Sequence, residues 1–297
     1  MKLLIYGHRG WIGQQVITYL NKIKQSKEFE YVCGNARVNE TQNLENEIKE
    51  VKPTHIISLI GRTHGNGIQT IDYLEDKLYE NIRDNLFSPL SLSLLSQKYN
   101  YHLTYLGTGC IFQYENLDSI LNGETNYKLF NESDKPNFFG SGYSVVKGFT
   151  DELMHLTNSL NIRIRMPITS NSNQRNFITK ITSYEKICSI PNSMSVLDEL
   201  IPIMIDMVFK NHTGTINMVN PGVITHNEIL EMYKEIVEPE FTWKNFTIEE
   251  QDKILKSKRS NNHLEKNKLQ ELYPTVKNIH ESIRHCLERM KKTSNDS

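Results

Sequence analysis

The chain has 297 residues, 38% of them hydrophobic and 23% charged, so it can bury a sizeable core as one large domain or two closely joined ones. A formal net charge of −1 gives no electrostatic footprint for nucleic acid or a membrane surface, so neither is expected as a partner. No signal peptide and no bilayer-spanning apolar run is recognisable, and we expect a cytoplasmic location.

Short apolar runs alternate with segments of helical spacing over the first part of the chain. In order, the predicted elements are a strand over 2–7, a helix over 11–24, a strand over 31–34, a helix over 41–51, a strand over 54–61, a helical stretch over about 68–98, a strand over 102–108, a helix over about 143–159 and a strand over 162–168. This β-α-β-α order predicts an α/β fold, a Rossmann-type doubly wound parallel sheet with helices on both faces.

The pattern becomes more mixed after about residue 170. A helix is predicted over 175–187, a strand over 215–220, and three further helical patterns close the chain, with 291–297 expected to fray. We therefore expect a dinucleotide-binding domain over 1–165. A smaller mixed α/β substrate lobe is expected over 166–297, with some segments returning to the sheet.

The chain has four cysteines, Cys33, Cys110, Cys188 and Cys286. Neither they nor the histidines occur at metal-ligand spacing, so no metal site is expected. Cys110 follows the predicted strand over 102–108, in the stretch YLGTGCIFQYEN. From position alone it is either a small buried hydrophobe or a thiol placed two residues from a hydroxyl for chemistry.

A glycine-rich turn, GHRGWIG, follows the first strand directly and opens the first helix. Gly7, Gly10 and Gly13 permit a tight turn, a close approach of backbone to pyrophosphate and close packing of helix on strand. The helix N-terminus then offers free N–H groups to phosphate. The GxxGxxG spacing favours a nucleotide site of the short-chain reductase type.

Two arginines bear on the choice of dinucleotide. The second strand ends in CGNAR, with no acidic residue placed to accept from a ribose 2′-hydroxyl. Arg37 stands there instead, and Arg9 lies inside the glycine loop. Both guanidinium groups suit a 2′-phosphate, so NADPH (NADP) is favoured over NADH.

A tyrosine and a lysine four residues apart, Tyr143 and Lys147, fall on one face of a predicted helix. There the ammonium group can lower the phenol pKa and hold a nicotinamide ribose. The same spacing occurs at Tyr73 and Tyr273, but Tyr273 precedes a proline that disfavours a helix. Only Tyr143 lies one helix after the strand ending at Thr108, and we expect it to donate the proton in a reduction.

With these pieces placed, the chain resembles the extended short-chain dehydrogenase/reductase family, and within it the nucleotide-rhamnose synthases (epimerase-reductases). The resemblance runs nearly end to end, through GTGCIF, YSVVKG, RNFITKITSYEKI, LDELIPI, NPGVITHNEILEMY, FTWKNFTIEEQ and RSNNHL. One departure is SLIGRTHGNG, which replaces the Asn-Ala-Ala start of the family's loop after the third strand. That loop borders the expected cofactor site.

The resemblance implies a 3,5-epimerase joined to an NADPH-dependent 4-reductase that converts UDP-4-keto-6-deoxyglucose to UDP-L-rhamnose. It implies that Thr108 is the catalytic hydroxyl residue and Cys110 an acid–base residue of the epimerisation. Lys180 is implied as the partner of Cys110 on the opposite face of the sugar. Tyr143 and Lys147 keep the roles given above.

Further contacts are expected around these groups. Trp11 and Ile12 in the glycine loop, and Ile60 and Gly61 after the third strand, are expected to contact the cofactor. The substrate-binding residues are expected to be Asn176, four residues before Lys180, together with Arg259 and Asn262, which would meet the diphosphate. A homodimer is implied by the family, and an upstream 4,6-dehydratase is expected to be a separate protein.

Two alternatives remain open. The chain could be a 4-reductase alone, acting on a 4-keto sugar that is already epimerised. It could also be a non-catalytic regulatory subunit that binds NADP. Cys110 and Lys180 argue against the first, and the set Thr108, Tyr143 and Lys147 argues against the second.

Overall fold

Six strands pair into one sheet in the computed structural model, which describes residues 1–295. In chain order they are β1 (Lys2–Tyr6), β2 (Glu30–Cys33), β3 (His55–Ser58), β4 (His102–Thr108), β5 (Leu160–Ile164) and β9 (Gly214–Asn217). The order across the sheet is β2-β1-β3-β4-β5-β9, and β1 pairs in parallel with β2 and β3, as β3 does with β4. Because β2 and β3 lie on opposite sides of β1, the order in which the strands are laid down reverses between β1 and β3. Ligands of such sheets bind at this point.

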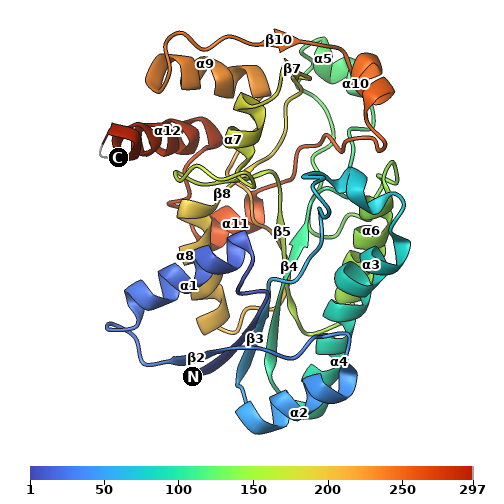
Figure 1. The fold of residues 1–297 in the computed structure, drawn as a ribbon, viewed down its shortest axis with the longest axis vertical. Helices are drawn as coiled ribbons and strands as arrows, with labels where there is room; N and C mark the ends of the chain where they lie inside the picture. The colour runs from blue at the N-terminus through green and yellow to red at the C-terminus, as the bar shows by residue number, and fades with distance from the viewer. Residues whose placement is uncertain (296–297) are drawn as a thin grey trace. The chain divides into compact units, whose positions relative to one another are not determined.

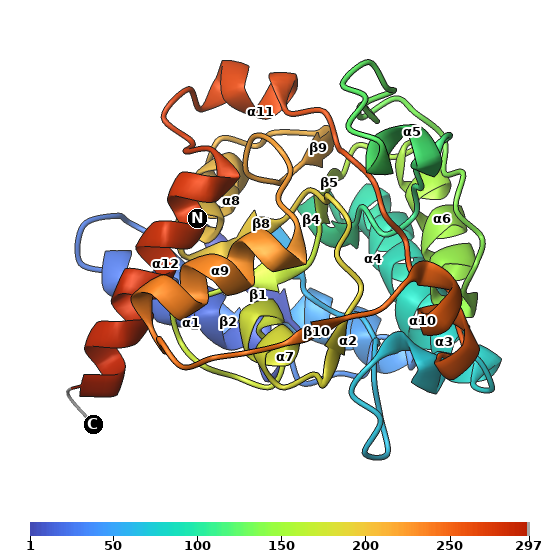
Figure 2. The same cartoon turned by 90° about the horizontal axis from the view of Figure 1, so that it is seen from above.

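Helices cover both faces of this sheet (Figures 1 and 2). Their bounds are α1 (Trp11–Ile23), α2 (Thr41–Val51), α3 (Leu78–Ile82), α4 (Ser88–Tyr99), α6 (Gly142–Met154) and α8 (Leu197–Phe209). Helices α2, α4 and α6 pack beside one another on one face, and α1 and α8 lie on the other. The apolar side chains of β1 and β3 are buried, as expected for strands covered on both faces. The predicted doubly wound α/β fold is confirmed.

The remaining elements are short strands and helices. They are α5 (Leu117–Leu121), β6 (Pro167–Ile168), α7 (Phe177–Thr182), β7 (Lys186–Ile187), β8 (Ser195–Val196), α9 (His226–Ile236), β10 (Lys244–Asn245), α10 (Ile248–Ile254), α11 (Asn267–Leu272) and α12 (Ile279–Asn295). Strand β6 pairs with β8 and β7 with β10, both in parallel. Helices α7, α9 and α12 share a core that includes Ile178, Ile229 and Leu287.

The described chain divides into two compact units that interleave in sequence. The first unit comprises Met1–Thr108, Ser141–Arg163 and Ile201–Ile216, and the second comprises the remaining segments, beginning at Gly109. Residues 201–216 return to the first unit, in line with the expected return of later segments to the sheet, whereas residues 109–140 belong to the second unit and not to the predicted first domain. The chain first passes from one unit to the other at Thr108–Gly109, inside the GTGCIF motif.

Three predicted helices differ from the observed ones. The stretch 68–98 begins later, with a 3₁₀ turn at Ile71–Leu74, and contains a π-helical turn at Arg83–Phe87, where the Ser88 hydroxyl donates to the Arg83 carbonyl. The helix over 143–159 ends at Met154, because the Thr157 amide and hydroxyl both bond to the Met154 carbonyl. The segment 175–187 is a short helix followed by strand β7, since the Thr182 hydroxyl turns back to Ile178.

The C-terminal region also differs from expectation. Four helices close the chain where three patterns were predicted, because 248–254 and 267–272 form separate short helices. The predicted fraying of 291–297 is wrong for 291–295, which continue helix α12. The last two residues, 296 and 297, lie outside the described part of the chain.

Candidate active site

The turn between β1 and α1 is a cradle of bare backbone in the first unit. Gly7 has φ of +79°, and a Cβ added there would lie 2.7 Å from the Leu59 carbonyl. A Cβ on Gly13 would lie 2.2 Å from the Gly7 oxygen, so this position also requires glycine. Gly10 is the N-cap of α1 and provides no side-chain cap, which leaves the helix N-terminus open toward a ligand. This cradle fits the pyrophosphate of a dinucleotide.

The residues predicted beside this cradle differ in accessibility. Trp11 and Ile12, in the first turn of α1, are half-buried, whereas Arg9 and Arg37 are exposed. Arg9 lies near the end of β2: burial raises the pKa of the Cys33 thiol there, and the charge of Arg9 acts to lower it. Two exposed guanidinium groups are therefore available in the glycine loop and just after β2, as a 2′-phosphate would need.

A carboxylate that sequence reasoning missed shapes the loop after β2. Glu47 of α2 accepts hydrogen bonds from the amides of Asn35 (2.7 Å) and Ala36 (3.1 Å) and from the Tyr6 hydroxyl (2.7 Å). It fixes the backbone immediately before Arg37. Its place in the amphipathic pattern of α2 gave no signal of this role.

The loop after β3 is held by an asparagine from the π-helical turn. The Asn85 side chain accepts from the Arg62 amide and donates to the Arg62 carbonyl, both at 2.9 Å. Ile60, which is half-buried, and Gly61, which is exposed, immediately precede this anchor. Sequence reasoning missed Asn85, although a π turn often marks a functional position in a helix.

Helix α6 presents the predicted tyrosine and lysine. It begins at Ser141, whose hydroxyl accepts from the Ser144 amide at 3.0 Å. Tyr143 and Lys147, one turn apart, are 8% and 4% exposed, and Thr108 at the end of β4 is 6% exposed. The alternative Tyr73 differs, because its hydroxyl donates to the Glu80 carboxylate.

Lys147 has a buried partner that sequence reasoning missed. Its Nζ donates to the Tyr105 hydroxyl and lies 4.6 Å from the centroid of the same ring. The pKa of Tyr105 is raised, chiefly by burial and further by Tyr143 and Asp151. Tyr105 therefore stays a neutral phenol, and it groups with Tyr143 and Lys147 in the first unit. A tyrosine on a buried strand gave no sequence signal of this contact.

Cys110 lies in a tight turn at the start of the second unit. A Cβ on Gly109 would lie 2.5 Å from Leu264 and 3.0 Å from Cγ of Arg165, so the turn requires glycine. The Gly109 amide donates to the Ile164 carbonyl at 3.0 Å. Cys110 is half-buried, which leaves part of the residue accessible.

A buried arginine supports this turn. Arg165 is 1% exposed and donates to the carbonyls of Gly109 (3.2 Å) and Ser260 (3.0 Å) and to Oδ1 of Asn192 (2.5 Å). Burial lowers the pKa of Arg165, while an electrostatic interaction with Cys110 acts to raise it. A guanidinium ion thus lies within electrostatic reach of the Cys110 thiol.

Asn262 lies behind the Cys110 turn. It is fully buried, and its amide nitrogen donates to the carbonyls of Gly109 and Phe112, both at 2.9 Å. Its contact with the substrate diphosphate stays a prediction, and in the structure this nitrogen bonds the backbone on either side of Cys110. Asn262 therefore positions the Cys110 turn.

Asn176 is also buried, and its place in the helix differs from the predicted one, while its substrate contact stays a prediction. It is fully buried as the N-cap of α7, where its Oδ1 accepts from the Ile178 amide at 3.1 Å. Its nitrogen donates to the carbonyls of Thr169 (2.7 Å) and Asn171 (2.9 Å). The predicted shared helix face with Lys180 does not exist, because an N-cap side chain turns back to its own helix end. Asn176 fixes the loop that leads into α7.

Lys180, on α7, lies in a cationic environment. The pKa of Lys180 is lowered to about 8, first by burial and then by the positive charges of Arg175 and Arg259. Arg259 is half-buried and donates to the carbonyl and the hydroxyl of Ser257 at 2.9 and 2.6 Å. A lysine with this pKa can exchange protons near neutral pH. Arg175 was not predicted.

The described residues also bear on metal binding and on membrane insertion. Residues 1–295 contain no group of three histidine, cysteine, aspartate or glutamate side chains that could hold a metal ion. Among the helices of this part of the chain, none has the length and apolar character needed to cross a membrane.

Comparison with known proteins identifies the family. No family model matches the chain. The chain is 53% identical over 295 residues to the uncharacterized protein L780 of Acanthamoeba polyphaga mimivirus, covering 98% of this chain and 99% of that one. The crystal structure of the L780 UDP-rhamnose synthase covers 98% of this chain and 99% of its own, with a TM-score of 0.92. The chain belongs to the nucleotide-rhamnose synthase family.

Two more distant relatives of the chain point to the same class of enzyme. The bifunctional dTDP-4-dehydrorhamnose 3,5-epimerase/dTDP-4-dehydrorhamnose reductase of Arabidopsis thaliana is 43% identical over 293 residues, which are 98% of this chain and 94% of that protein. A dTDP-4-dehydrorhamnose reductase from Clostridium acetobutylicum, 16% identical, shares the fold over 97% of this chain and 99% of its own, with a TM-score of 0.78. The predicted family, nucleotide-sugar epimerase/reductases of the short-chain dehydrogenase/reductase class, is confirmed.

Proposed function

We propose that the chain is a bifunctional 3,5-epimerase and NADPH-dependent 4-reductase that converts UDP-4-keto-6-deoxyglucose to UDP-L-rhamnose. Its 53% identity to a protein whose structure is described as a UDP-rhamnose synthase supports the product. The observation that carries the bifunctional assignment is the presence of both Cys110 and Lys180 in the second unit. The first is a half-buried thiol near the Arg165 guanidinium, and the second is a lysine whose pKa is lowered to about 8.

The epimerase half needs two proton exchanges at carbon. The C4 ketone acidifies the C3 and C5 protons, so a base on one face of the sugar can remove each of them. An acid on the opposite face then returns a proton and inverts the centre. Cys110 and Lys180 are the proposed pair, because a thiol and an amine can each exchange a proton, and the pKa of Lys180 is lowered to about 8. Thr108 and Tyr143 are proposed to donate hydrogen bonds to the enolate oxygen.

The reductase half uses the residues of the first unit. NADPH, proposed to be held by the glycine cradle, Arg9 and Arg37, supplies the hydride for C4. Tyr143 gives its proton to the O4 oxygen, and Lys147 beside it favours the phenolate that results. Thr108 precedes Cys110 by two residues, so chain continuity alone keeps these two residues within about 7 Å of backbone.

The test is to incubate the protein with UDP-4-keto-6-deoxyglucose and NADPH in D₂O and to locate deuterium in the product. Label at C3 and C5 of a rhamnose product is expected. A reduced sugar without label at those carbons would replace the proposal by a 4-reductase alone. If the protein consumed no NADPH with this or the dTDP-linked ketone, a non-catalytic NADP-binding protein would be favoured.

A cysteine variant separates the two activities. Cys110→Ala is expected to lower deuterium incorporation at C3 and C5 by about 10²–10⁴-fold, while NADPH binding is unchanged. Cys188→Ala, which removes a buried thiol elsewhere in the same unit, is the matched control and should keep the exchange. Equal exchange in Cys110→Ala and the control would show that another group is the base.

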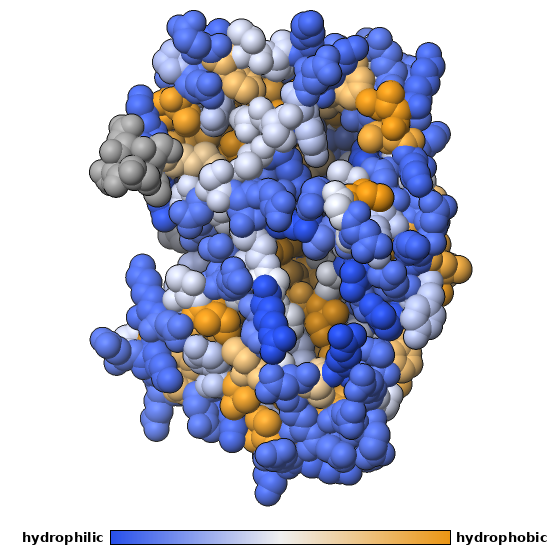
Figure 3. All heavy atoms as spheres, viewed as in Figure 1, coloured by the Kyte–Doolittle hydropathy of each residue, from blue (hydrophilic) through white to orange (hydrophobic). Residues whose placement is uncertain are grey.

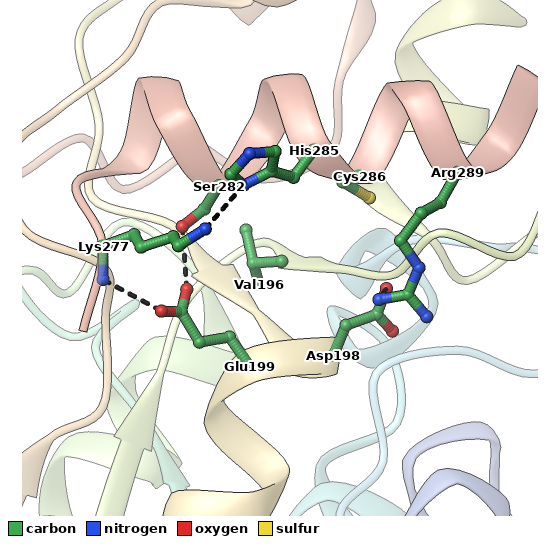
Figure 4. Close-up of a pocket in the computed structure, with 8 residues that line it drawn as sticks. All are labelled: Val196, Asp198, Glu199, Lys277, Ser282, His285, Cys286 and Arg289. Carbon is green, nitrogen blue, oxygen red and sulfur yellow. Dashed lines mark hydrogen bonds and ion pairs between the residues drawn. The ribbon is translucent and has the colours of Figure 1, made fainter. Parts of the chain in front are cut away.

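Two partners follow from the proposal. The 4-keto substrate must come from a 4,6-dehydratase, which we propose is a separate protein. We also propose a homodimer, because α3, α4, α6 and the turn after α6 expose large apolar residues in the first unit. The most exposed are Leu78, Tyr79, Leu94, Phe149 and Leu156, each at 60% or more. On the face drawn in Figure 3, hydrophobic residues are interspersed with hydrophilic ones.

The dimer has its own test. Light scattering after size-exclusion chromatography is expected to give twice the chain mass. The variant Leu94→Glu/Phe149→Glu is expected to give the monomer mass, and the matched variant Leu272→Glu, on the exposed surface of α11, should stay dimeric. A monomer mass for the unmodified chain at assay concentration would reject the homodimer.

A further inference from the structure

Arg175 carries a buried nitrogen with nothing to bond to. Its Nη1 is inaccessible to solvent and has no hydrogen-bond partner among residues 1–295. A buried guanidinium N–H without an acceptor is costly, and an ion or a catalytic role is among the explanations for such a group in a native protein. Burial also lowers the pKa of Arg175, as expected for a cation removed from water without a counter-charge.

The backbone holds Arg175 in a fixed place. Its amide donates to Oδ1 of Asn173 at 2.9 Å, and the next residue is Asn176, the buried N-cap of α7. The side chain of Asn176 in turn binds the carbonyls of Thr169 and Asn171. Arg175 is therefore anchored at the entrance to the helix that carries Lys180.

Two arginines act on Lys180 in this part of the second unit. The pKa of Lys180 is lowered first by burial and then by the charges of Arg175 and Arg259, of which Arg175 has the larger effect. Helix α9 packs against α7 and carries two titratable rings, Tyr233 and His226, and the latter lies 5.1 Å from the ring of Phe177. The pKa of His226 is lowered to about 4, mainly by burial and then by Arg165, so it stays neutral near pH 7. Burial and the two arginines together therefore disfavour the ammonium form of Lys180.

We propose that Arg175 is a ligand for the diphosphate of the nucleotide sugar, and that a diphosphate bound there causes Lys180 to take up a proton from solvent. The proposal rests on the function proposed above, which supplies a diphosphate diester as ligand. Two negative charges beside Arg175 and Arg259 compensate the field that disfavours the ammonium form. Near pH 8 Lys180 is divided between amine and ammonium in the free protein, and diphosphate binding shifts it toward the ammonium acid.

Binding is measured by isothermal titration calorimetry with UDP-glucose and dTDP-glucose, which carry the diphosphate but lack the C4 ketone. Arg175→Gln is expected to weaken the affinity by about 10- to 100-fold for whichever sugar binds more tightly, as for the loss of a charged hydrogen bond. Arg175→Lys, which keeps the charge, should lose less, and uridine, which lacks the diphosphate, should not distinguish Arg175→Gln from the parent.

Proton uptake is read from the same titrations in buffers of different ionisation enthalpy. At pH 8 about half of Lys180 is protonated in the free protein, so uptake approaching half a proton is expected, falling toward zero at pH 6. Lys180→Met should abolish the uptake while the sugar still binds. Arg175→Gln should reduce it, because Lys180 is then largely protonated before binding.

The outcomes separate this inference from the proposed function. Equal affinity of Arg175→Gln and the parent, or no proton uptake at pH 8, would overturn the inference and leave the function standing. No binding of either nucleotide sugar to the unmodified protein would instead count against the proposed function and remove the inference with it.

Discussion

The two sets of proposed catalytic residues are built in different ways. Tyr143 and Lys147 stand one turn apart on a regular helix of 13 residues and are almost fully buried. Cys110 lies in a turn and Lys180 on a helix of six residues, and both are half-buried. The reduction residues are positioned by backbone geometry. The proton-transfer residues are positioned by hydrogen bonds between side chains and loop carbonyls, so the second set should be the more fragile of the two.

Removing the phenol hydroxyl gives the largest expected effect on chemistry. Tyr143→Phe should lower the rate of NADPH oxidation with the 4-keto substrate by about 10²–10⁴-fold, because no proton reaches O4. Thermal unfolding should change little, because the helix and its cap remain intact. Tyr73→Phe, the matched tyrosine of the same Tyr-X-X-X-Lys pattern, should reduce at near the parent rate. A comparable rate in both variants would remove Tyr143 from the reaction.

Asn262→Ala tests whether the turn that holds Cys110 depends on side-chain hydrogen bonds. The carbonyls of Gly109 and Phe112 lose their donor, at an expected cost of about 1–3 kcal/mol in the free energy of unfolding. Deuterium exchange at C3 and C5 should fall more than NADPH binding does. The control is Asn267→Ala, an exposed asparagine of the same unit. Equal losses in exchange and in NADPH affinity would contradict a role confined to the Cys110 turn.

Tyr105→Phe has the smallest expected effect. It tests how the Tyr143 and Lys147 pair on α6 is held in place. The ring stays beside Lys147 but the hydrogen bond is lost, at about 0.5–1.5 kcal/mol of stability. The KM for NADPH should rise a few-fold, because Lys147 is held less well against the ribose. Tyr101→Phe, whose hydroxyl donates to the Leu92 carbonyl, should lose stability without changing this KM. An unchanged KM in Tyr105→Phe would limit Tyr105 to a structural role.

Features that depend on the spacing of residues close together in the chain were predictable from the sequence. The alternation of apolar runs with amphipathic segments predicts the doubly wound sheet, and GxxGxxG after the first strand predicts the open end of α1. The i, i+4 spacing places Tyr143 and Lys147 correctly because both lie within one unbroken helix. Each of these signals needs only neighbours in the chain.

The supports of the second unit could not be predicted because their partners are remote in sequence. The alternating pattern IRIR suggests that Arg163 and Arg165 face solvent, yet both are fully buried. Arg163 pairs with Asp151, and Arg165 bonds to residues as far away as Ser260. The periodicity of 175–187 likewise placed Asn176 within a helix, although it is the N-cap. A local pattern does not show that a buried charge will find its ion-pair or hydrogen-bond partners far away in the sequence.

The tight turn at Gly109 has a consequence for protein engineering. A thiol cannot be transplanted into another reductase by changing one residue at the position of Cys110. The preceding residue must lack a side chain, since a Cβ at Gly109 would overlap Leu264 and press on Arg165. The graft must also carry Arg165 and Asn262, which hold the turn's carbonyls. The unit to transplant is therefore a turn with its buried scaffold, assembled from segments more than 50 residues apart.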